Sequence, residues 1–409
     1  MIRRIQALNY RCFRHLDIAL DRFHVLIGPN GGGKHTLIDT VRFLGDLVRE
    51  GPEAAVGARA GDFRDLVWGR PEHDGRFEIA VEFVIPERCI RLLPAERDFG
   101  TYRYEVAMGR DADGVRIEAE RGVLMPPPGP APAQETLFPY PLEPPSTILS
   151  SARPGASTAL SKASGNDWFY AETAGGKGWT KIGINFGPRR STLGSLPESV
   201  DTMPVTTEFK DFLERRVRRL TLDGDALGGH CAADAPDSVP AADGSNLPAL
   251  VRRMRHDRRG HFEEWLKEVQ ASVPGLVDIR VSEREPDRAE YLVLVYDDGR
   301  ESPAWLESEG TLKLLVLTLL PALPPIGGLY WVVEPERSLH PSALGAVLGA
   351  LDAVPGAQVL ASTHSRALVD QVQPEHLLCL DRNPAGEARV VRGSEHLPAG
   401  ERAAAGDGV

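Results

Sequence analysis

The N-terminal residues alternate between apolar and polar side chains in the manner of β-strands. The pattern covers residues 2–8, 15–20 and 23–27 and predicts three strands. A glycine-rich stretch follows the third strand at once, and apolar residues then recur with helical spacing over 36–44. The chain is therefore predicted to begin with strands that lead through a glycine-rich loop into a helix.

The middle of the chain mixes strand patterns with irregular stretches. RFEIAVEFVIP and GTYRYEVAMG repeat with period two, which is typical of strands. The DADG turn at 111–114 predicts a hairpin between GTYRYEVAMG and VRIEAERGVLM. We expect the proline-rich residues 126–145 to form an irregular insertion or surface loop.

Helical patterns return in two later stretches, residues 206–221 and 246–271, with a loop rich in Gly, Ala and Asp between them. DIRVSE and EYLVLVYDD then read as antiparallel strands. From Ser308 onward helices alternate with the buried strands LYWVV, AQVLAST and HLLCLDR. Such alternation predicts an α/β fold with a mostly parallel sheet.

Composition narrows the class of protein. The chain has 409 residues, of which 42% are hydrophobic, and its formal net charge is −11. An acidic surface argues against wholesale coating of nucleic acid but leaves room for a local basic patch. The four cysteines are far apart, so neither a zinc site nor a disulfide framework is indicated, and we expect a reducing cytoplasm. The longest apolar run, 312–333, is broken by a lysine and three prolines, so no membrane span is expected.

A phosphate-binding loop is predicted where the third strand meets the helix. GPNGGGKHT, at residues 28–36, fits the pattern GxxxxGK up to its lysine. In such loops backbone N–H groups cradle phosphate oxygens, glycines permit that backbone, and the helix N-terminus favours anions. Lys34 would reach the β and γ phosphates. The candidate nucleotide-binding residues here are Asn30, Gly31, Gly33, Lys34, His35 and Thr36.

One residue of this loop departs from the pattern. The position after the lysine is Ser or Thr in the motif, because its hydroxyl binds Mg²⁺. His35 occupies that position, and imidazole is a poor ligand for a hard cation that prefers oxygen. Thr36 lies one position later and is expected to point elsewhere. We therefore expect the loop to bind ATP, leave open whether Mg²⁺ binds with it, and assign no metal ligand.

Three further motifs lie in the C-terminal part of the chain. A buried strand ends in an acidic residue in LYWVVEPERSLHP, which places Glu334 at the carboxyl end of the sheet. LESEGTLKLL has Ser308 and Gly310 before a helix, a pattern that a simple helix cap also explains. ASTHS follows another strand and contains His364.

These motifs resemble those of SMC/RecF-like ABC ATPases, a group that includes the OLD and related AAA-type ATPases of bacteria. EPERSLHP is similar to the family segment (D/E)EPExxLHP, whose LHP fixes the register. The resemblance implies that Glu334 polarises the attacking water and that His364 contacts the γ-phosphate of ATP. It also implies that Ser308 and Gly310 face ATP on the P-loop of a second copy. Val333 stands where the family has an acid that helps hold Mg²⁺.

The resemblance also sets the expected domain organisation. Residues 1–85 and 290–395 are expected to be the two halves of one P-loop NTPase domain, an ABC-type head with a mixed sheet. Residues 86–289 are expected to be an inserted α+β and helical lid module, and 396–409 a flexible tail. Two weaker matches carry less: DGSNL at 243–247 resembles a family DGxNL segment but is equally a turn with a helix cap. FRDLV at 63–67 lies where a Q-loop would fall, without a glutamine.

Two arginine clusters suggest a partner. On the predicted helices Arg215 would share a face with Arg219, and Arg252 with Arg255 and Arg259. Such stripes can neutralise DNA phosphates, or they can be solvated helix faces paired with nearby acids. DNA and an effector protein are thus both candidate partners.

Two functions remain open from the sequence. The first is a cytoplasmic, homodimeric ATPase that couples ATP binding and slow hydrolysis to engagement of DNA or a partner protein. Its role would be in genome maintenance or in defence against phage. The second is a degenerate, non-hydrolysing ATP-binding scaffold, because His35 and Val333 remove two contributions to Mg²⁺ binding.

Overall fold

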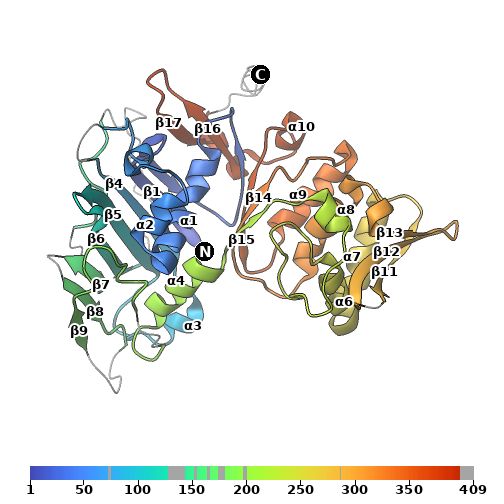
Figure 1. The fold of residues 1–409 in the computed structure, drawn as a ribbon, viewed down its shortest axis with the longest axis horizontal. Coiled ribbons are helices and arrows are strands. Elements are labelled where there is room, and N and C mark those ends of the chain that lie inside the picture. The colour runs from blue at the N-terminus through green and yellow to red at the C-terminus, as the bar shows by residue number, and fades with distance from the viewer. Residues whose placement is uncertain are drawn as a thin grey trace. The chain divides into compact units, whose positions relative to one another are not determined.

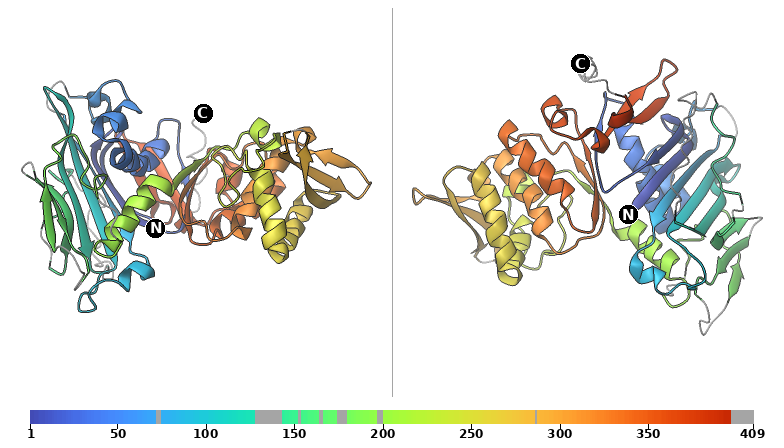
Figure 2. Two further views of the ribbon diagram at one scale, coloured as in Figure 1. Left: turned by 60° about the horizontal axis from the view of Figure 1, so that its bottom comes forward. Right: turned by 180° about the vertical axis from the view of Figure 1, so that it is seen from behind.

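The computed structural model describes residues 1–71, 75–127, 143–151, 154–163, 166–173, 180–196, 200–285 and 287–396. The described chain folds into two compact units (Figures 1 and 2). Unit 1 comprises described residues within 1–20, 30–217 and 380–390, and unit 2 comprises described residues within 21–29, 218–379 and 391–396. The 86–289 segment is thus divided between the units, and its assignment as one inserted module stays a prediction. Most of the expected proline-rich loop and nearly all of the expected tail lie outside the described residues.

Unit 1 is built on an eight-stranded sheet in the order β2-β1-β4-β5-β6-β7-β8-β9, whose neighbouring strands are antiparallel. Helices α1, α2 and α4 lie on one face of this sheet (Figure 1). The predicted hairpin is confirmed, since β5 and β6 pair from Thr101↔Met125 to Asp111↔Gly114. The elements are β1 (Ile2–Tyr10), β2 (Phe13–Ala19), α1 (Lys34–Glu50), α2 (Pro52–Gly57), the 3-10 helix η1 (Phe63–Leu66), β4 (Phe77–Val84), α3 (Glu87–Ile90), β5 (Thr101–Asp111), β6 (Gly114–Met125), β7 (Ser157–Ala163), β8 (Asn166–Tyr170), β9 (Lys181–Ile184) and α4 (Pro204–Arg215).

Unit 2 contains the parallel strands that the sequence predicted. Strands β14 and β15 pair in parallel, and β3 pairs in parallel with both β15 and β16, within a sheet of order β10-β14-β15-β3-β16-β17. The α/β prediction is therefore confirmed. The sheet elements are β3 (Phe23–Ile27), β10 (Val217–Leu220), β14 (Gly328–Val333), β15 (Ala357–Ser362), β16 (Leu377–Arg382) and β17 (Ala388–Arg392).

Helices and a small second sheet complete unit 2. The predicted antiparallel pair is confirmed as β11 and β12, with β13 on its edge. Helices α6 and α7 pack on this small sheet, and α7 also contacts α8. The elements are α5 (Gly224–Gly228), α6 (Leu247–Asp257), α7 (Arg259–Ser272), β11 (Leu276–Arg284), β12 (Ala289–Tyr296), β13 (Glu301–Pro303), η2 (Ala304–Leu306), α8 (Glu309–Leu319), η3 (Leu320–Ala322), η4 (Pro341–Ala343), α9 (Leu344–Asp352), α10 (Arg366–Val369), η5 (Pro374–His376) and α11 (Gly393–His396).

Two helix predictions need correction. The helix predicted over 206–221 ends at Arg215, and residues 217–220 form the strand β10 beside β14. The β-branched Val217 and the fully buried Leu220 fit a strand that pairs in a sheet. The helix predicted over 246–271 is interrupted at Arg258, whose φ of −137° and ψ of 51° are not helical. Arg219 therefore does not share a helix with Arg215, nor Arg259 with Arg252 and Arg255, whereas the expected face of Arg252 and Arg255 lies on one helix, α6.

None of the helices within the described residues is long and apolar enough to cross a membrane.

Candidate nucleotide site

The glycine-rich loop enters α1 with the backbone that a P-loop needs. Gly31 and Gly33 have φ of 74° and 106°, in the left-handed region where glycine carries no steric penalty. Gly33 is the N-cap of α1, and its carbonyl accepts the amide of Leu37 at 2.8 Å. The sequence GPNGGGK therefore produces a loop whose last residues lead directly into a 17-residue helix.

Close packing in unit 1 holds the end of this loop. A Cβ on Gly33 would lie 3.2 Å from each of three atoms: Cys12 Sγ, Phe13 Cζ and Ala388 Cβ. These neighbours come from the turn after β1, the start of β2 and the start of β17. A side chain at this position would thus be crowded as well as strained in its backbone conformation.

The polar side chains of the loop differ in exposure. Lys34 is only 5% exposed, whereas Asn30 and His35 are exposed. The Thr36 hydroxyl forms a hydrogen bond with the Cys12 thiol, whose pKa is raised because it is buried. Thr36 thus engages the Cys12 side chain of the turn between β1 and β2.

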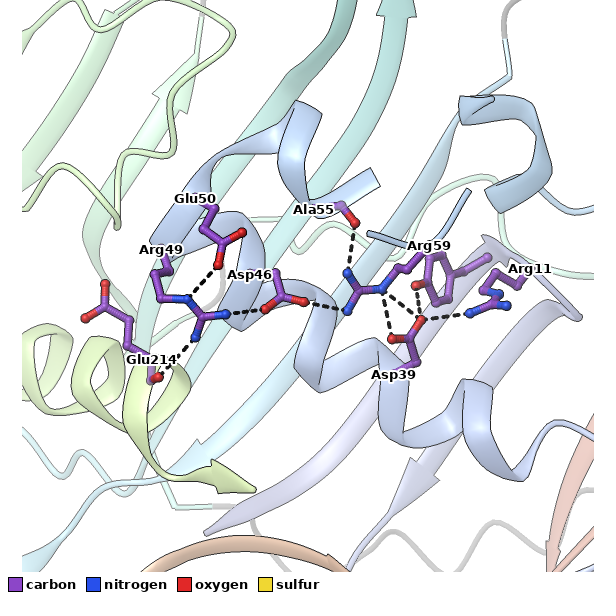
Figure 3. Close-up of polar contacts among 9 residues, drawn as sticks. Arg11, Asp39, Asp46, Arg49, Glu50, Ala55, Arg59 and Glu214 are labelled. Carbon is purple, nitrogen blue, oxygen red and sulfur yellow. Dashed lines mark hydrogen bonds and ion pairs between the residues drawn. The ribbon is translucent and has the colours of Figure 1, made fainter. Parts of the chain in front are cut away.

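A buried charge network fixes α1 (Figure 3). The Asp39 carboxylate accepts hydrogen bonds from Tyr10 Oη at 2.7 Å, Arg59 Nε at 2.8 Å and Arg11 Nη1 at 3.1 Å. Arg59, 6% exposed at its side chain, also pairs with Asp46 at 2.9 Å. Burial and the neighbouring carboxylate raise the pKa of Tyr10 well above its ordinary value, so the phenol stays protonated. Strand β1, the turn after it and the segment after α2 are thereby tied to the helix that carries Lys34.

The same network reaches α4. Arg49 pairs with Asp46 at 2.6 Å and with Glu50 at 3.0 Å, and its guanidinium donates to the carbonyl of Glu214 at 3.3 Å (Figure 3). Sequence reasoning missed this network, although Asp39 is an acid among the apolar positions of the predicted helix.

In unit 2 the predicted acidic segment lies at the carboxyl edge of the parallel strands. Val333 pairs with Ser362, and Ser362 with Leu26. The ladder continues one residue further, because the Glu334 amide donates to the Ser362 carbonyl at 2.8 Å and the Thr363 amide to the Leu26 carbonyl at 3.0 Å. Residues that follow three adjacent strands therefore leave the sheet at one edge, where α/β folds bind ligands.

The backbone after β14 is unusual. Glu334 and Ser338 have φ of 46° and 69°, a region that residues with a Cβ rarely occupy. The Arg337 amide closes the turn by donating to the Glu334 carbonyl at 3.1 Å. Among the described residues the Glu334 carboxylate forms no hydrogen bond or ion pair. Strained backbone that presents a free carboxylate is a feature of functional sites.

A second carboxylate, to which the sequence analysis gave no role, lies beside this turn. Glu336 Oε1 accepts a hydrogen bond from the Thr363 hydroxyl at 2.5 Å, and Thr363 Oγ1 accepts the Ser365 amide at 2.8 Å. Glu336 Oε2 is buried and has no partner in the described part of the chain. His364 lies between these contacts in sequence and is itself exposed.

The start of α8 contacts the turn that follows Glu334. Ser308 caps α8, with Oγ accepting the Thr311 amide at 3.1 Å, so the helix-cap interpretation of this serine is correct structurally. A Cβ on Gly310 would lie 2.2 Å from the Ser338 carbonyl oxygen. The glycine is therefore needed for close approach of two backbone segments, and the two predicted motifs meet here.

Ionic contacts strengthen this junction. Glu309 pairs with Lys313 at 2.8 Å and accepts a hydrogen bond from the Ser338 hydroxyl at 2.9 Å. Lys313, 4% exposed, also donates to the Arg337 carbonyl at 3.4 Å. The acid–base spacing of four residues was the available sequence signal for Glu309 and Lys313.

Two positions of the sequence motifs lack the oxygen donors expected to support Mg²⁺. His35 offers an imidazole where an oxygen ligand is expected, and Val333 offers only methyl groups. Across the residues with described positions, no group of three His, Cys, Asp or Glu side chains is placed to hold a metal ion.

The arginines of the basic clusters are held by nearby acids or by an aromatic ring. The contacts are Arg215 with Asp211 at 3.3 Å, Arg252 with Glu290 at 3.0 Å, Arg255 with Asp278 at 2.9 Å, Arg259 with Glu263 at 2.9 Å, and Arg219 above the Trp331 ring at 4.5 Å. Four of these five arginines therefore pair with an acid, and the fifth lies over an aromatic ring.

The DGSNL segment is a structural turn before α6. Asn246 is 4% exposed, and its amide group donates to the carbonyls of Pro236 and Val239 and accepts the Ala241 amide. Gly244 has a φ of 84°. These contacts close the preceding loop and support the turn interpretation.

Comparison with known proteins bears on unit 2 above all. Residues 236–370 match the family model described as "AAA domain, putative AbiEii toxin, Type IV TA system". This segment includes Ser308, Gly310, Glu334 and His364. The match covers about a third of the chain and supports the resemblance of these C-terminal motifs to an AAA domain.

Solved structures similar to the chain include SMC head domains at low sequence identity. An SMC head bound to the C-winged helix domain of ScpA is 13% identical, with a TM-score of 0.49 over 95% of this chain and 97% of that one. An SMC head from Thermotoga maritima is 12% identical, with a TM-score of 0.40 over 96% and 98%. A Pyrococcus furiosus complex, an Smc head domain with an extended coiled coil bound to the C-terminal domain of ScpA, is 11% identical, with a TM-score of 0.46 over 95% of each chain.

Proposed function

We propose that the chain binds ATP at its P-loop and closes as a homodimer around two ATP molecules. The observation that carries this proposal is the GPNGGGK loop, with Gly31 and Gly33 at positive φ and Lys34 at the start of a long helix. Backbone N–H groups at such a helix start are the donors that phosphate oxygens need. The family match to the C-terminal motifs supports ATP as the nucleotide.

In this proposal the residues of unit 2 act on the terminal phosphate. Glu334 has a free carboxylate at the carboxyl edge of the strands and would orient the attacking water. The exposed His364 would contact the γ-phosphate, and the start of α8 at Ser308 and Gly310 would face the ATP held by the second copy. The exposed imidazole and the α8 N-terminus are compatible with these roles.

The second candidate is an ATP-responsive scaffold without hydrolysis. His35 and Val333 favour it, because both remove oxygen donors from the region where Mg²⁺ assists hydrolysis. DNA or an effector protein as the partner, and a role in genome maintenance or phage defence, remain part of the proposal. The proposed compartment is the cytoplasm, since all four cysteines are free.

One experiment separates these functions. ATP binding and phosphate release are measured for the full chain with Mg²⁺, with and without duplex DNA, and its mass in solution is measured with and without ATP. Binding lost in Lys34→Ala supports the P-loop, and turnover lost in Glu334→Gln but kept in Glu375→Gln, an exposed matched control, supports the ATPase. Binding without turnover supports the scaffold, and absence of binding overturns both.

His35→Ser combined with Val333→Asp restores the two side-chain types that the motifs call for. The double variant should hydrolyse ATP faster than the natural chain by about tenfold or more, because an oriented metal ion contributes several kcal/mol of charge stabilisation. Unchanged hydrolysis in a folded double variant contradicts the idea that these two residues limit turnover.

A further inference from the structure

The hairpin of β16 and β17 lies against the P-loop in unit 1. The Ala388 amide donates to the Cys12 carbonyl at 2.9 Å, and Ala388 packs on Gly33 as described above. At the same turn of the hairpin, Arg382 is the last residue of β16. A Cβ on Gly31 would lie 3.8 Å from Arg382 Nη2 and 3.9 Å from its Cζ. A guanidinium group therefore lies beside the middle of the phosphate-binding loop.

The positive charge of Arg382 has no acidic partner among the described residues, whereas that of Arg11 does. Arg11, in the turn between β1 and β2, is paired with Asp39 at 3.1 Å. Arg382 is exposed, and its guanidinium forms no hydrogen bond or ion pair with any residue whose position is described. Its positive charge acts on Cys12 against the effect of burial, which raises the pKa of that thiol. The Arg382 charge thus reaches the base of the loop.

A guanidinium suits a phosphate chain for geometric reasons. Its planar fork can donate two parallel hydrogen bonds to phosphate oxygens, and it is always charged. ATP carries several negative charges, which need compensation in any binding site. The usual metal-supporting side chains are absent here, since His35 and Val333 replace them.

We propose that Arg382 binds the phosphate groups of the nucleotide held by the P-loop and supplies positive charge that a metal ion would otherwise supply. This inference rests on the proposed function. It implies that the chain binds free ATP nearly as well as ATP with Mg²⁺, and that this tolerance depends on one side chain from the C-terminal hairpin.

The test is an equilibrium titration of the full chain with ATP, either with Mg²⁺ or with EDTA. The natural chain should bind ATP with dissociation constants that differ by less than about threefold between the two conditions. Arg382→Gln should weaken binding about tenfold in EDTA and less with Mg²⁺, which is the fold-change expected for one charge-assisted contact. Arg382→Lys should retain part of the affinity. Arg91→Gln, which removes an equal charge at an exposed site directly after α3, should bind as the natural chain does.

The possible results have distinct meanings. If the natural chain binds ATP and Arg382→Gln binds it equally well in EDTA, the role of Arg382 is overturned while the P-loop function stands. If natural binding is lost in EDTA, the metal tolerance is overturned in the same way. If neither the natural chain nor any variant binds ATP under either condition, the proposed function fails as well. Thermal unfolding of each variant shows that the comparison is made between folded proteins.

Discussion

The two units secure their candidate nucleotide-site segments by different forces. In unit 1 the P-loop helix is tied down by buried charges, with Asp39 and Arg59 at the centre. In unit 2 the turn after β14 is held by backbone contacts, the closest being the approach of Gly310 to the Ser338 carbonyl. This difference between buried charges and backbone contacts predicts which substitutions each segment tolerates. Removing a charge should damage the first segment, and adding an atom should damage the second.

The largest effect is expected from Asp39→Ala. The substitution leaves Arg59, 6% exposed at its side chain, with Asp46 as its remaining acid and removes the acceptor of Tyr10. Breaking one partner out of a buried ion pair costs about 4 kcal/mol. We expect a loss of that size in the free energy of unfolding, measured by urea titration.

The matched control for Asp39→Ala is Glu87→Ala. Glu87 at the start of α3 pairs with Arg91 directly after this helix, but both side chains are more than 70% exposed. An exposed pair of this kind contributes less than about 1 kcal/mol. Equal losses for the two variants would show that charge does not secure the P-loop helix.

Gly310→Ala tests the backbone contact in unit 2. The new Cβ would lie 2.2 Å from the Ser338 oxygen, so the start of α8 or the turn after Glu334 must move. Overpacking of this kind costs about 3 kcal/mol, and the displacement should also reduce any ATP hydrolysis that depends on Glu334. Gly349→Ala, in α9 with open space around its Cβ, should be neutral or stabilise the fold by up to about 1 kcal/mol. A stable, active Gly310→Ala variant rules out the close approach.

The sequence predicts the parallel strands well and the interactions between segments poorly. Strand β14 and the segment after it were predictable, because a buried strand that ends in an acid before LHP is a local pattern. The approach of Gly310 to Ser338 was not predictable, because the two residues are 28 positions apart and neither periodicity nor a motif connects them.

Helix limits failed where two local preferences competed. The run ERRVRRL has helical charge spacing, yet Val217 and Leu220 enter a strand because pairing in a sheet overrides local propensity. In the same way, Asp39 could be read as an exposed acid, and only the fold brings Tyr10 and Arg59 to it. Long-range burial was the missing information.

A buried acid in unit 1, Glu172, contributes to the stability of the fold in a way that depends on pH. Glu172 is buried, and it accepts hydrogen bonds from the Val205 and Thr206 amides at the start of α4. Burial raises its pKa to about 7, from an ordinary value of 4.5. Between these values the folded chain holds a proton that the unfolded chain has lost, so the Glu172 contribution to stability falls as pH rises from 4.5 to 7.

Comparison with Glu172→Gln isolates this contribution. The free energy of unfolding of the natural chain minus that of the variant should fall by about 2 kcal/mol between pH 5 and pH 8, because each unit of pKa shift corresponds to about 1.4 kcal/mol. Groups that titrate alike in both chains cancel in the difference. A flat difference over this range would mean that the Glu172 pKa is not raised. Such a result would place more weight on the Asp39 network as the feature that distinguishes unit 1.

The smallest effect is expected where the two units are alike, at their exposed arginines. Arg215 in unit 1 and Arg259 in unit 2 are 70% and 83% exposed, and each pairs with an acid four residues away. Such helix pairs contribute about 0.5 kcal/mol or less. The double variant Arg215→Gln, Arg259→Gln should unfold like the natural chain, and its affinity for duplex DNA should change by less than about twofold at 0.15 M salt. Each arginine that binds a DNA phosphate contributes about one unit to the slope of log K against log salt. A reduction of this salt slope by about two units, measured by fluorescence anisotropy titrations, would therefore show that both arginines leave their acidic partners for DNA. Exposed charges of both units would then contribute to DNA binding.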